Sequence, residues 1–300
     1  MDDTGTVVAS TPEEVLRRLE WQVIRRLDGL LQGDYRTIFR GVGLDFRDLR
    51  EYEPGDDVRH IDWNVTARMD TPYVRQYSED RELTAWLLLD RSPSMGFGPI
   101  DRPKELVLCE LATTLARLLT RNGNRVGAIL FDNEIENTLS PRNTRNQVLL
   151  LTQELLRRPR VNGAITDLSG LLTFALGAVR RRSLIVLASD FITPAGWEGP
   201  LLELSERHEV VAIRLTDPRE YDLPEAGVIV VEDAETGEQL TVDSSDAEFR
   251  QRLRRAGEER EAELRDATLR AGVDIHEVST EDDLVEALVR IVEARKRRRR

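Results

Sequence analysis

The feature that most constrains the fold is a repeated alternation of short apolar segments with longer amphipathic ones, which starts after the first quarter of the chain. The segments 83–90, 125–132 and 183–190 are apolar almost throughout, as strands buried on both faces of a sheet are. The segment 104–121 instead spaces its apolar residues at helical intervals. Strands that alternate with helices predict an α/β fold with a doubly wound, mostly parallel sheet over residues 83–294.

The remaining segments complete this division of the chain. The other predicted strands and helices of the sheet domain cover residues 135–141, 144–158, 167–182, 197–207, 209–215, 245–271 and 273–279, and a last helix from residue 283 runs into the basic tail. Residues 218–243 interrupt the pattern and predict a hairpin insertion, because two alternating segments flank a turn signal. We also expect an N-terminal helical segment over 1–34, an irregular or β segment over 35–82, and a basic tail over 295–300.

The charge of the chain limits the partners it can bind. The sequence has 43 basic and 55 acidic residues, a formal net charge of -12, although its last six residues are all basic. The body is therefore acidic, which argues against general nucleic-acid binding, because that requires basic surface that neutralises phosphates. The basic tail has two readings: a solvated end, or a contact with anionic lipid or an acidic partner. Membrane contact is expected only through this tail.

Cysteine usage and hydropathy indicate the compartment. Cys109 is the only cysteine, so an intramolecular disulfide is excluded and a cysteine-based zinc site is not expected. It falls on an apolar helical pattern, where a buried and inert thiol is ordinary. The N-terminus lacks the apolar core of a signal peptide, and no apolar run approaches the ~20 residues that span a bilayer. These features predict a cytoplasmic protein.

Oxygen-bearing side chains follow several of the predicted strands. Asp90 ends the first strand, and Ser92 and Ser94 come directly after it. Thr166 lies in a loop just before a later helix, and Asp190 ends another strand. Because the carboxyl ends of parallel strands meet at one edge of a sheet, we expect these side chains to lie close together. A set of oxygens without His or Cys favours Mg²⁺, with Mn²⁺ or Ca²⁺ as alternatives, over zinc or copper.

Catalytic readings of the same loop fit less well. A phosphatase that phosphorylates its own aspartate needs a second carboxylate two residues after Asp90, where Ser92 stands. A hydrolase serine lies between glycines in G-x-S-x-G and has a histidine partner, and neither Ser92 nor Ser94 has that frame. No GxGxxG or Walker A pattern offers a phosphate cradle. A metal-free reading also stands, in which these side chains only cap the helices that follow them.

The spacing D-x-S-x-S at residues 90–94, together with Thr166 and Asp190, resembles the metal-ion-dependent adhesion site, or MIDAS, of von Willebrand factor A domains. The resemblance implies a von Willebrand A-like, Rossmann-type domain whose ion is completed by a carboxylate from a protein partner. Three hydroxyls would then be ligands, and two aspartates would hold the ion or its waters: Ser92, Ser94, Thr166, Asp90 and Asp190. One departure is A-I-T-D at 164–167, where these domains commonly have G-G-T-D.

A second resemblance is more specific and covers about residues 35–290. The stretch 41–68, GVGLDFRDLREYEPGDDVRHIDWNVTAR, followed by LLLDRSPSM at 87–95, is similar to the bacterial family catalogued as domain of unknown function 58. Members of this family commonly accompany MoxR-type AAA+ ATPases. The resemblance implies a metal-dependent protein-interaction module, not an enzyme, that acts with such an ATPase in maturation or remodelling of a client complex. The alternative is an Mg/Mn-dependent phosphohydrolase that uses the same oxygen cluster.

The stretch before the sheet domain carries two further hypotheses. Asp56, Asp57, His60 and Asp62 suggest a second metal site, but their spacing fits no ligand scheme, and salt bridges with nearby arginines are the expected use. Trp63 is expected to anchor a small core, because a large aromatic side chain more often packs than recognises a ligand.

Overall fold

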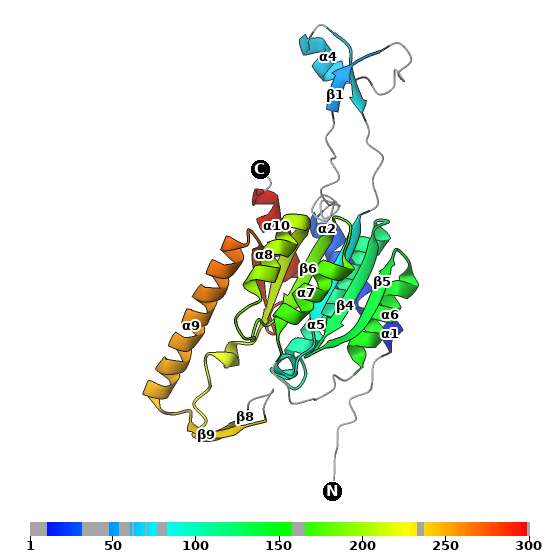
Figure 1. Ribbon diagram of the computed structural model, residues 1–300. Helices are drawn as coiled ribbons and strands as arrows, with labels where there is room; N and C mark the ends of the chain where they lie inside the picture. Colours follow the sequence, from blue (N-terminus) through cyan, green and yellow to red (C-terminus); the bar gives the residue numbers. More distant parts are fainter. Residues whose placement is uncertain are drawn as a thin grey trace.

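The computed structural model describes residues 11–31, 48–53, 61, 63–69, 71–76, 83–157, 166–232 and 237–298. Six strands form its central sheet in the order β10-β7-β6-β3-β4-β5 (Figure 1). Their bounds are Thr84–Asp90 (β3), Arg125–Phe131 (β4), Ile135–Arg142 (β5), Leu184–Ser189 (β6), Glu209–Thr216 (β7) and Asp274–Ser279 (β10). Every neighbouring pair is parallel except β4 with β5, which is antiparallel. The predicted α/β fold with a mostly parallel sheet is therefore confirmed.

The strand order reverses between β3 and β6. Numbered by their place in the chain, the six strands run 6-5-4-1-2-3 across the sheet. The chain thus moves from β3 outward to β5, returns to the middle at β6, and then moves to the opposite edge at β10. In open sheets of this kind, ligands bind beyond the carboxyl ends of the strands at the point of reversal. We therefore expect a ligand site among the residues that follow β3 and β6.

Helices cover both faces of the sheet (Figure 1). One face packs against α5 (Lys104–Arg121), α6 (Arg145–Leu156) and α10 (Leu284–Arg298), and the other against α7 (Leu168–Ala178), α8 (Glu198–Arg207) and α9 (Ala247–Arg270). Within β3, Leu87 and Leu89 belong to the first core, and Trp86 and Leu88 to the second. Successive strand residues point to opposite faces, so a continuously apolar strand supplies both cores at once.

The N-terminal helical segment is part of the first of these layers. It consists of α1 (Pro12–Leu19), one π-helical turn, η1 (Glu20–Ile24), and α2 (Arg25–Leu31). Thr11 and Glu14 form a capping box that satisfies the first free amides of α1. Leu16 and Leu27 are buried in the same core as the β3 side chains. Burial of this apolar stripe holds the segment against α5, α6 and α10.

The stretch between the N-terminal helices and the sheet contains a small unit of its own. Strands β1 (Asp48–Glu51) and β2 (Tyr73–Gln76) pair antiparallel, and α4 (Trp63–Met69) contacts β2. Thr66 Oγ1 accepts a hydrogen bond from Tyr73 N at 3.0 Å. Trp63 is 69% exposed, so the prediction that it anchors a core is wrong: α4 docks through Thr66, and nothing described covers its first residue. The four residues of the second metal hypothesis, Asp56, Asp57, His60 and Asp62, lie outside the described residues.

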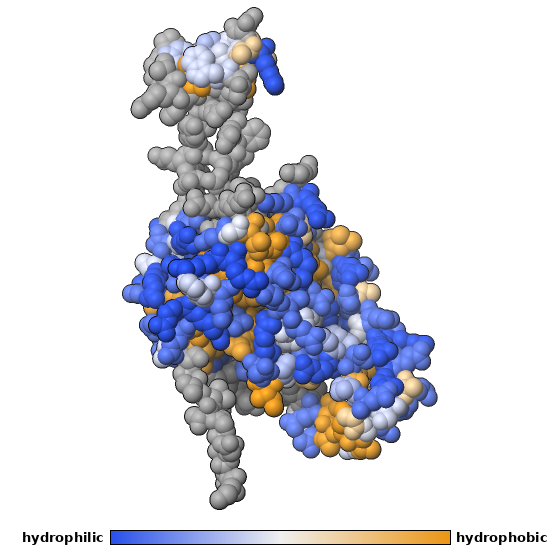
Figure 2. All heavy atoms as spheres, turned by 180° about the vertical axis from the view of Figure 1, so that it is seen from behind, coloured by the Kyte–Doolittle hydropathy of each residue, from blue (hydrophilic) through white to orange (hydrophobic). Residues whose placement is uncertain are grey.

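The predicted insertion is a hairpin that follows a short 3-10 turn, η4 (Pro218–Glu220). Strands β8 (Val228–Glu232) and β9 (Gln239–Asp243) pair antiparallel. At the base of the hairpin, the amide and the hydroxyl of Ser244 both donate to the carbonyl oxygen of Gly227, at 2.8 and 2.9 Å. Figure 2 shows an apolar patch over this arm, to which exposed side chains such as Val230 and Leu240 belong.

The last helix runs into the basic segment, as predicted, but it buries the first residue of the predicted tail. α10 continues through Arg298, and Arg295 is only 6% exposed, in an ion pair with Glu209 at the start of β7. Arg295 lies one turn beyond Ile291 and Val292, so it continues the buried face of the helix. The prediction of a basic tail from residue 295 is therefore wrong for Arg295. Among the described helices, none is long and apolar enough to cross a membrane.

Candidate functional site

Asp90 is the last residue of β3, and Asp190 directly follows β6, so both lie where the strand order reverses. Both side chains are buried, at 1% and 2% exposure. The short 3-10 turn η3 (Pro93–Gly96) follows Asp90 and carries Ser94. The structure therefore brings together, at the carboxyl ends of β3 and β6, the segments that the sequence predicted to meet.

Asp90 is held by donors from both sides of the crevice. Its Oδ1 accepts from the amide of Ser92 at 2.9 Å, and its Oδ2 accepts from the hydroxyl of Ser189 at 2.6 Å. Burial, and secondarily the negative charge of Asp190, raises the pKa of Asp90 to about 7, although the bonds from Ser189 and Ser92 act in the opposite direction. The donors are neutral, so they orient this carboxylate without neutralising it.

Ser189 was not anticipated from the sequence. Its hydroxyl donates to Asp90 and accepts from the amide of Phe191 at 2.8 Å. Phe191 has a φ of 58°, in the left-handed region that side chains other than glycine rarely adopt, and its ring packs edge-on against Trp197. The strained residue is thus fixed on both sides, which sets the path of the loop that carries Asp190. Its signal in the sequence was its place at the end of an apolar strand, directly before Asp190 in the ending SDF at 189–191.

The two serines of the D-x-S-x-S motif contact each other. Ser92 Oγ and Ser94 Oγ lie 3.0 Å apart, and both side chains are buried, at 1% and 6% exposure. Ser92 stands at the N-cap position of η3 but makes no side-chain capping bond there. The reading in which these residues only cap helices therefore does not describe Ser92.

Thr166 is buried at the start of the segment that leads into α7. Its carbonyl oxygen accepts from Thr193 Oγ1 at 3.0 Å, and the same hydroxyl accepts from the amide of Leu168 at 3.1 Å. Thr193 therefore ties the loop of Thr166 to the loop that follows Asp190. The cap of α7 is the neighbouring Asp167, whose Oδ1 accepts from the amide of Ser169 at 2.8 Å.

A lysine that the sequence did not predict as part of the site reaches into it. Lys104, the first residue of α5, has no exposed surface, and its Nζ lies 2.7 Å from Asp190 Oδ2. It also forms an ion pair with Glu220 of η4. Burial lowers the pKa of Lys104, but the carboxylates of Asp190 and Glu220 raise it more, and the net direction is upward. Lys104 is therefore an ammonium group at physiological pH.

The donor atoms fit a small divalent cation, with one complication. Hydroxyl and carboxylate oxygens are the ligands that Mg²⁺ and Ca²⁺ use, and here they are buried at the reversal point of the sheet. Within the described residues, no group of three or more His, Cys, Asp or Glu side chains could share an ion, so a metal here would depend on the hydroxyls. The complication is that Lys104 already contacts Asp190.

The described histidines are not placed to activate a serine of this site. His208 directly precedes β7, at the opposite end of the strands from Asp90, and His276 lies within β10, at the edge of the sheet. Burial is the largest cause that lowers the pKa of each. A serine nucleophile needs a base within hydrogen-bond reach, and these positions do not supply one.

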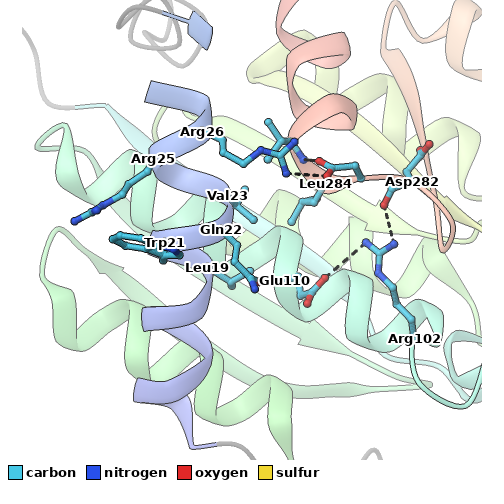
Figure 3. A pocket seen from close by; sticks show the side chains of 12 residues that line it. Leu19, Trp21, Gln22, Val23, Arg25, Arg26, Arg102, Glu110, Asp282 and Leu284 are labelled. Carbon is cyan, nitrogen blue, oxygen red and sulfur yellow. Dashed lines mark hydrogen bonds and ion pairs between the residues drawn. The ribbon is translucent and has the colours of Figure 1, made fainter. Parts of the chain in front are cut away.

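A pocket of about 780 Å³ lies elsewhere, between η1 and the start of α10 (Figure 3). Figure 3 shows Arg102 between Glu110 of α5 and Asp282. Arg26 pairs with Asp283 at 2.8 Å, and the guanidinium of Arg25 lies over the Trp21 ring. The arginines of this pocket are thus engaged by carboxylates, a backbone carbonyl and an aromatic ring, which link the N-terminal helices to the start of α10.

Comparison with solved structures gives matches of low identity. The conserved hypothetical protein BatB from Bacteroides thetaiotaomicron is 13% identical with a TM-score of 0.45, and the match covers 72% of this chain and 99% of that one. An aerotolerance-related membrane protein from Bacteroides fragilis is 14% identical with a TM-score of 0.41, over 71% of this chain and 98% of that one.

Comparison at the sequence level is more specific. An uncharacterized protein of Mycobacterium tuberculosis is 35% identical over 286 residues, which cover 94% of this chain and 89% of the relative. An uncharacterized protein of Mycobacterium avium is 33% identical over 159 residues, which cover 52% of this chain and 92% of that protein. The family described as "Protein of unknown function DUF58" matches residues 48–263, a span that includes the whole strand edge from Asp90 to Glu220. The chain therefore belongs to the DUF58 family.

Proposed function

We propose that this chain is a protein-interaction module whose binding depends on a divalent metal ion, Mg²⁺ by preference, at the carboxyl ends of β3 and β6. The observation that carries the proposal is the pair of buried hydroxyls, Ser92 Oγ and Ser94 Oγ, 3.0 Å apart beside the buried carboxylate of Asp90. Buried hydroxyls are costly unless they are hydrogen-bonded, and these two are kept in place by their bond to each other. The Ser92 hydroxyl does not cap the turn that follows it.

The residues that would hold the ion divide into two kinds. Ser92, Ser94 and Thr166 supply neutral hydroxyls, and Asp90 and Asp190 supply carboxylates that bind the ion or its waters. When bound, Mg²⁺ would supply an electrophilic position for a carboxylate of a partner protein. Ser189 and the Ser92 amide keep Asp90 oriented in the crevice, so the carboxylate is positioned before any ion arrives.

The partner is proposed on different grounds. The family resemblance supports a MoxR-type AAA+ ATPase, with this chain as its adaptor in maturation or remodelling of a client complex in the cytoplasm. The carboxylate that completes the ion would come from the ATPase or from the client. The phosphohydrolase alternative would use the same oxygen cluster, but the described histidines lie away from the serines and supply no base there.

The test compares Mg²⁺ binding by wild type and by Asp90→Ala in calorimetric titrations. We expect binding by wild type and none by Asp90→Ala. The matched control is Asp167→Ala, which removes a carboxylate that caps α7 beside the site, and we expect it to retain binding. Equal affinity in wild type and Asp90→Ala, with both folded by circular dichroism, would contradict the proposal.

The partner is tested by affinity capture with the same three proteins, each with Mg²⁺ and with chelator. An ATPase captured by wild type and by Asp167→Ala in Mg²⁺, and lost from Asp90→Ala and after chelation, is held through the metal. Capture that is equal under all these conditions would assign the ATPase to another surface. Phosphatase assays of wild type with Mg²⁺ and Mn²⁺ test the enzymatic alternative directly.

A further inference from the structure

Lys104 occupies a position that a lysine rarely takes. It is the first residue of α5, where the helix dipole disfavours positive charge, and its side chain has no exposed surface. A buried ammonium is retained only when carboxylates pair with it. Lys104 has two such partners, and they come from different loops: Asp190 after β6 and Glu220 after β7.

Both oxygens of Asp190 are already engaged. Oδ1 accepts from the amide of Ile192 at 3.0 Å, and Oδ2 accepts from Lys104 Nζ at 2.7 Å. Asp90, by contrast, accepts from an amide and a hydroxyl. Asp190 thus pairs with a cation, whereas the donors described on Asp90 are neutral, and an ion that needs Asp190 must compete with Lys104.

Glu220 gives the lysine a second anchor. One oxygen of its carboxylate pairs with Lys104, and the other accepts from the amide of Asp217 at 3.2 Å in the capping box of η4. The carboxylate of Asp217 is in turn held by Thr280 Oγ1 at 2.5 Å, after β10. Glu220 is thus held by its own turn independently of Asp190.

We propose that Lys104 is an internal competitor of the metal ion: it withholds Asp190 from a divalent cation and thereby weakens the affinity of the site. This inference rests on the proposed function and adds its regulation. Lys104 acts in two ways, because it occupies Asp190 Oδ2 and its positive charge repels a second cation nearby. Glu220 lets Lys104 release Asp190 and still keep one carboxylate, so the competition is limited rather than complete.

The proposal predicts opposite effects for two related variants. Lys104→Met/Glu220→Gln removes the competing ammonium together with one carboxylate, so the net charge is unchanged and Asp190 is free for the ion. We expect Mg²⁺ to bind this double variant at least about tenfold more tightly than wild type. Glu220→Gln alone leaves Lys104 with Asp190 as its one carboxylate partner, and we expect Mg²⁺ to bind about tenfold more weakly.

The matched control changes a buried ion pair at the other end of the same sheet. Arg295 pairs with Glu209 at the start of β7, so Arg295→Met/Glu209→Gln makes the same chemical change away from the site. We expect this control to bind Mg²⁺ as wild type does. Calorimetric titration with MgCl₂ gives the affinities of all four proteins, and circular dichroism establishes that each is folded.

The outcomes separate this inference from the proposed function. Tighter binding by Lys104→Met/Glu220→Gln supports the inference, because a lysine that merely supported the fold would give weaker binding when removed. Wild-type binding without any gain in that variant overturns the inference and leaves the metal site standing. Binding by the double variant and none by wild type overturns the limited competition proposed here, because Lys104 would then block the ion completely. Binding by none of the four proteins overturns both.

Discussion

Ser189 Oγ lies 2.6 Å from Asp90 Oδ2 and joins the last residue of β6 to the last residue of β3. This single hydrogen bond spans the point at which the strand order reverses. It connects a hydroxyl that also fixes Phe191 with the carboxylate at the head of the D-x-S-x-S motif. The geometry of the crevice therefore depends on a residue outside the motif itself.

Ser189→Ala should destabilise the fold by about 1–3 kcal/mol, because it leaves a buried carboxylate and the Phe191 amide each without one partner. Denaturant unfolding measures the change. The control is Ser169→Ala, which removes another hydroxyl-to-carboxylate bond, to Asp167, at an exposed site. There we expect a change below about 0.5 kcal/mol. An equal loss of unfolding free energy in the two variants would show that the buried bond to Asp90 contributes no more than the exposed one.

Gly127→Ala should also destabilise the fold, by about 1–3 kcal/mol, through overpacking. A Cβ at Gly127 would lie 2.9 Å from the Leu139 carbonyl oxygen, from Pro141 and from the Trp86 ring, where β4 meets β5. Gly170→Ala in α7 is the control, since the nearest atoms to its Cβ are 3.8 Å away in Phe131. Thermal unfolding should place the melting temperature of Gly127→Ala below that of wild type and that of Gly170→Ala at or above it.

The thiol of Cys109 should not react in the native protein at about pH 8, since only thiolate is nucleophilic. Burial raises the pKa of Cys109 to about 12 from its ordinary value of 9.0. Titration with a chromogenic disulfide reagent should detect one thiol in denaturant and none without it. The same shift implies that stability falls as the pH rises above 9, because the unfolded chain then loses a proton that the folded chain keeps. Rapid labelling of the native protein would contradict the prediction that the thiol of Cys109 does not react.

His208 should make the protein less stable in mild acid. Burial, and secondarily the charge of Arg207, lowers the pKa of His208 below its ordinary value of 6.5. The unfolded chain therefore binds a proton more readily, and the stability present above pH 6.5 is lost as the pH falls through the folded-state pKa. Free energies of unfolding at about pH 7.5 and about pH 5.5 should differ less in His208→Gln than in wild type. An identical pH dependence in both proteins would show that His208 does not cause the loss of stability in mild acid.

The sheet domain could be predicted because the spacing of apolar residues along each strand and helix depends on which of its faces are buried. The predicted helix 104–121 coincides with α5, and the predicted strand 209–215 differs from β7 by one residue. Strands buried on both faces and helices buried on one face leave distinct patterns, and parallel strand ends must meet. The placement of Asp90 and Asp190 at one strand edge followed from these rules.

The parts that could not be predicted depend on contacts far apart in the sequence. Lys104 looks like an ordinary charged residue at the start of a helix, and only the fold brings it to Asp190, 86 positions away. Trp63 was expected in a core because of its size, but α4 uses Thr66 for its contact with β2. Arg295 was assigned to a tail by its charge, while its place on the apolar face of α10 decided its burial.

The clamp that Ser244 forms on Gly227 has a practical consequence for all of these experiments. The two ends of the hairpin are hydrogen-bonded to each other at its base. We therefore expect an insertion between β8 and β9 to leave β7 and α9, on either side of the hairpin, in place. The segment that joins β8 to β9 is thus a suitable place for inserting an affinity handle. A protein immobilised there keeps its N-terminal helices and its basic C-terminus unaltered.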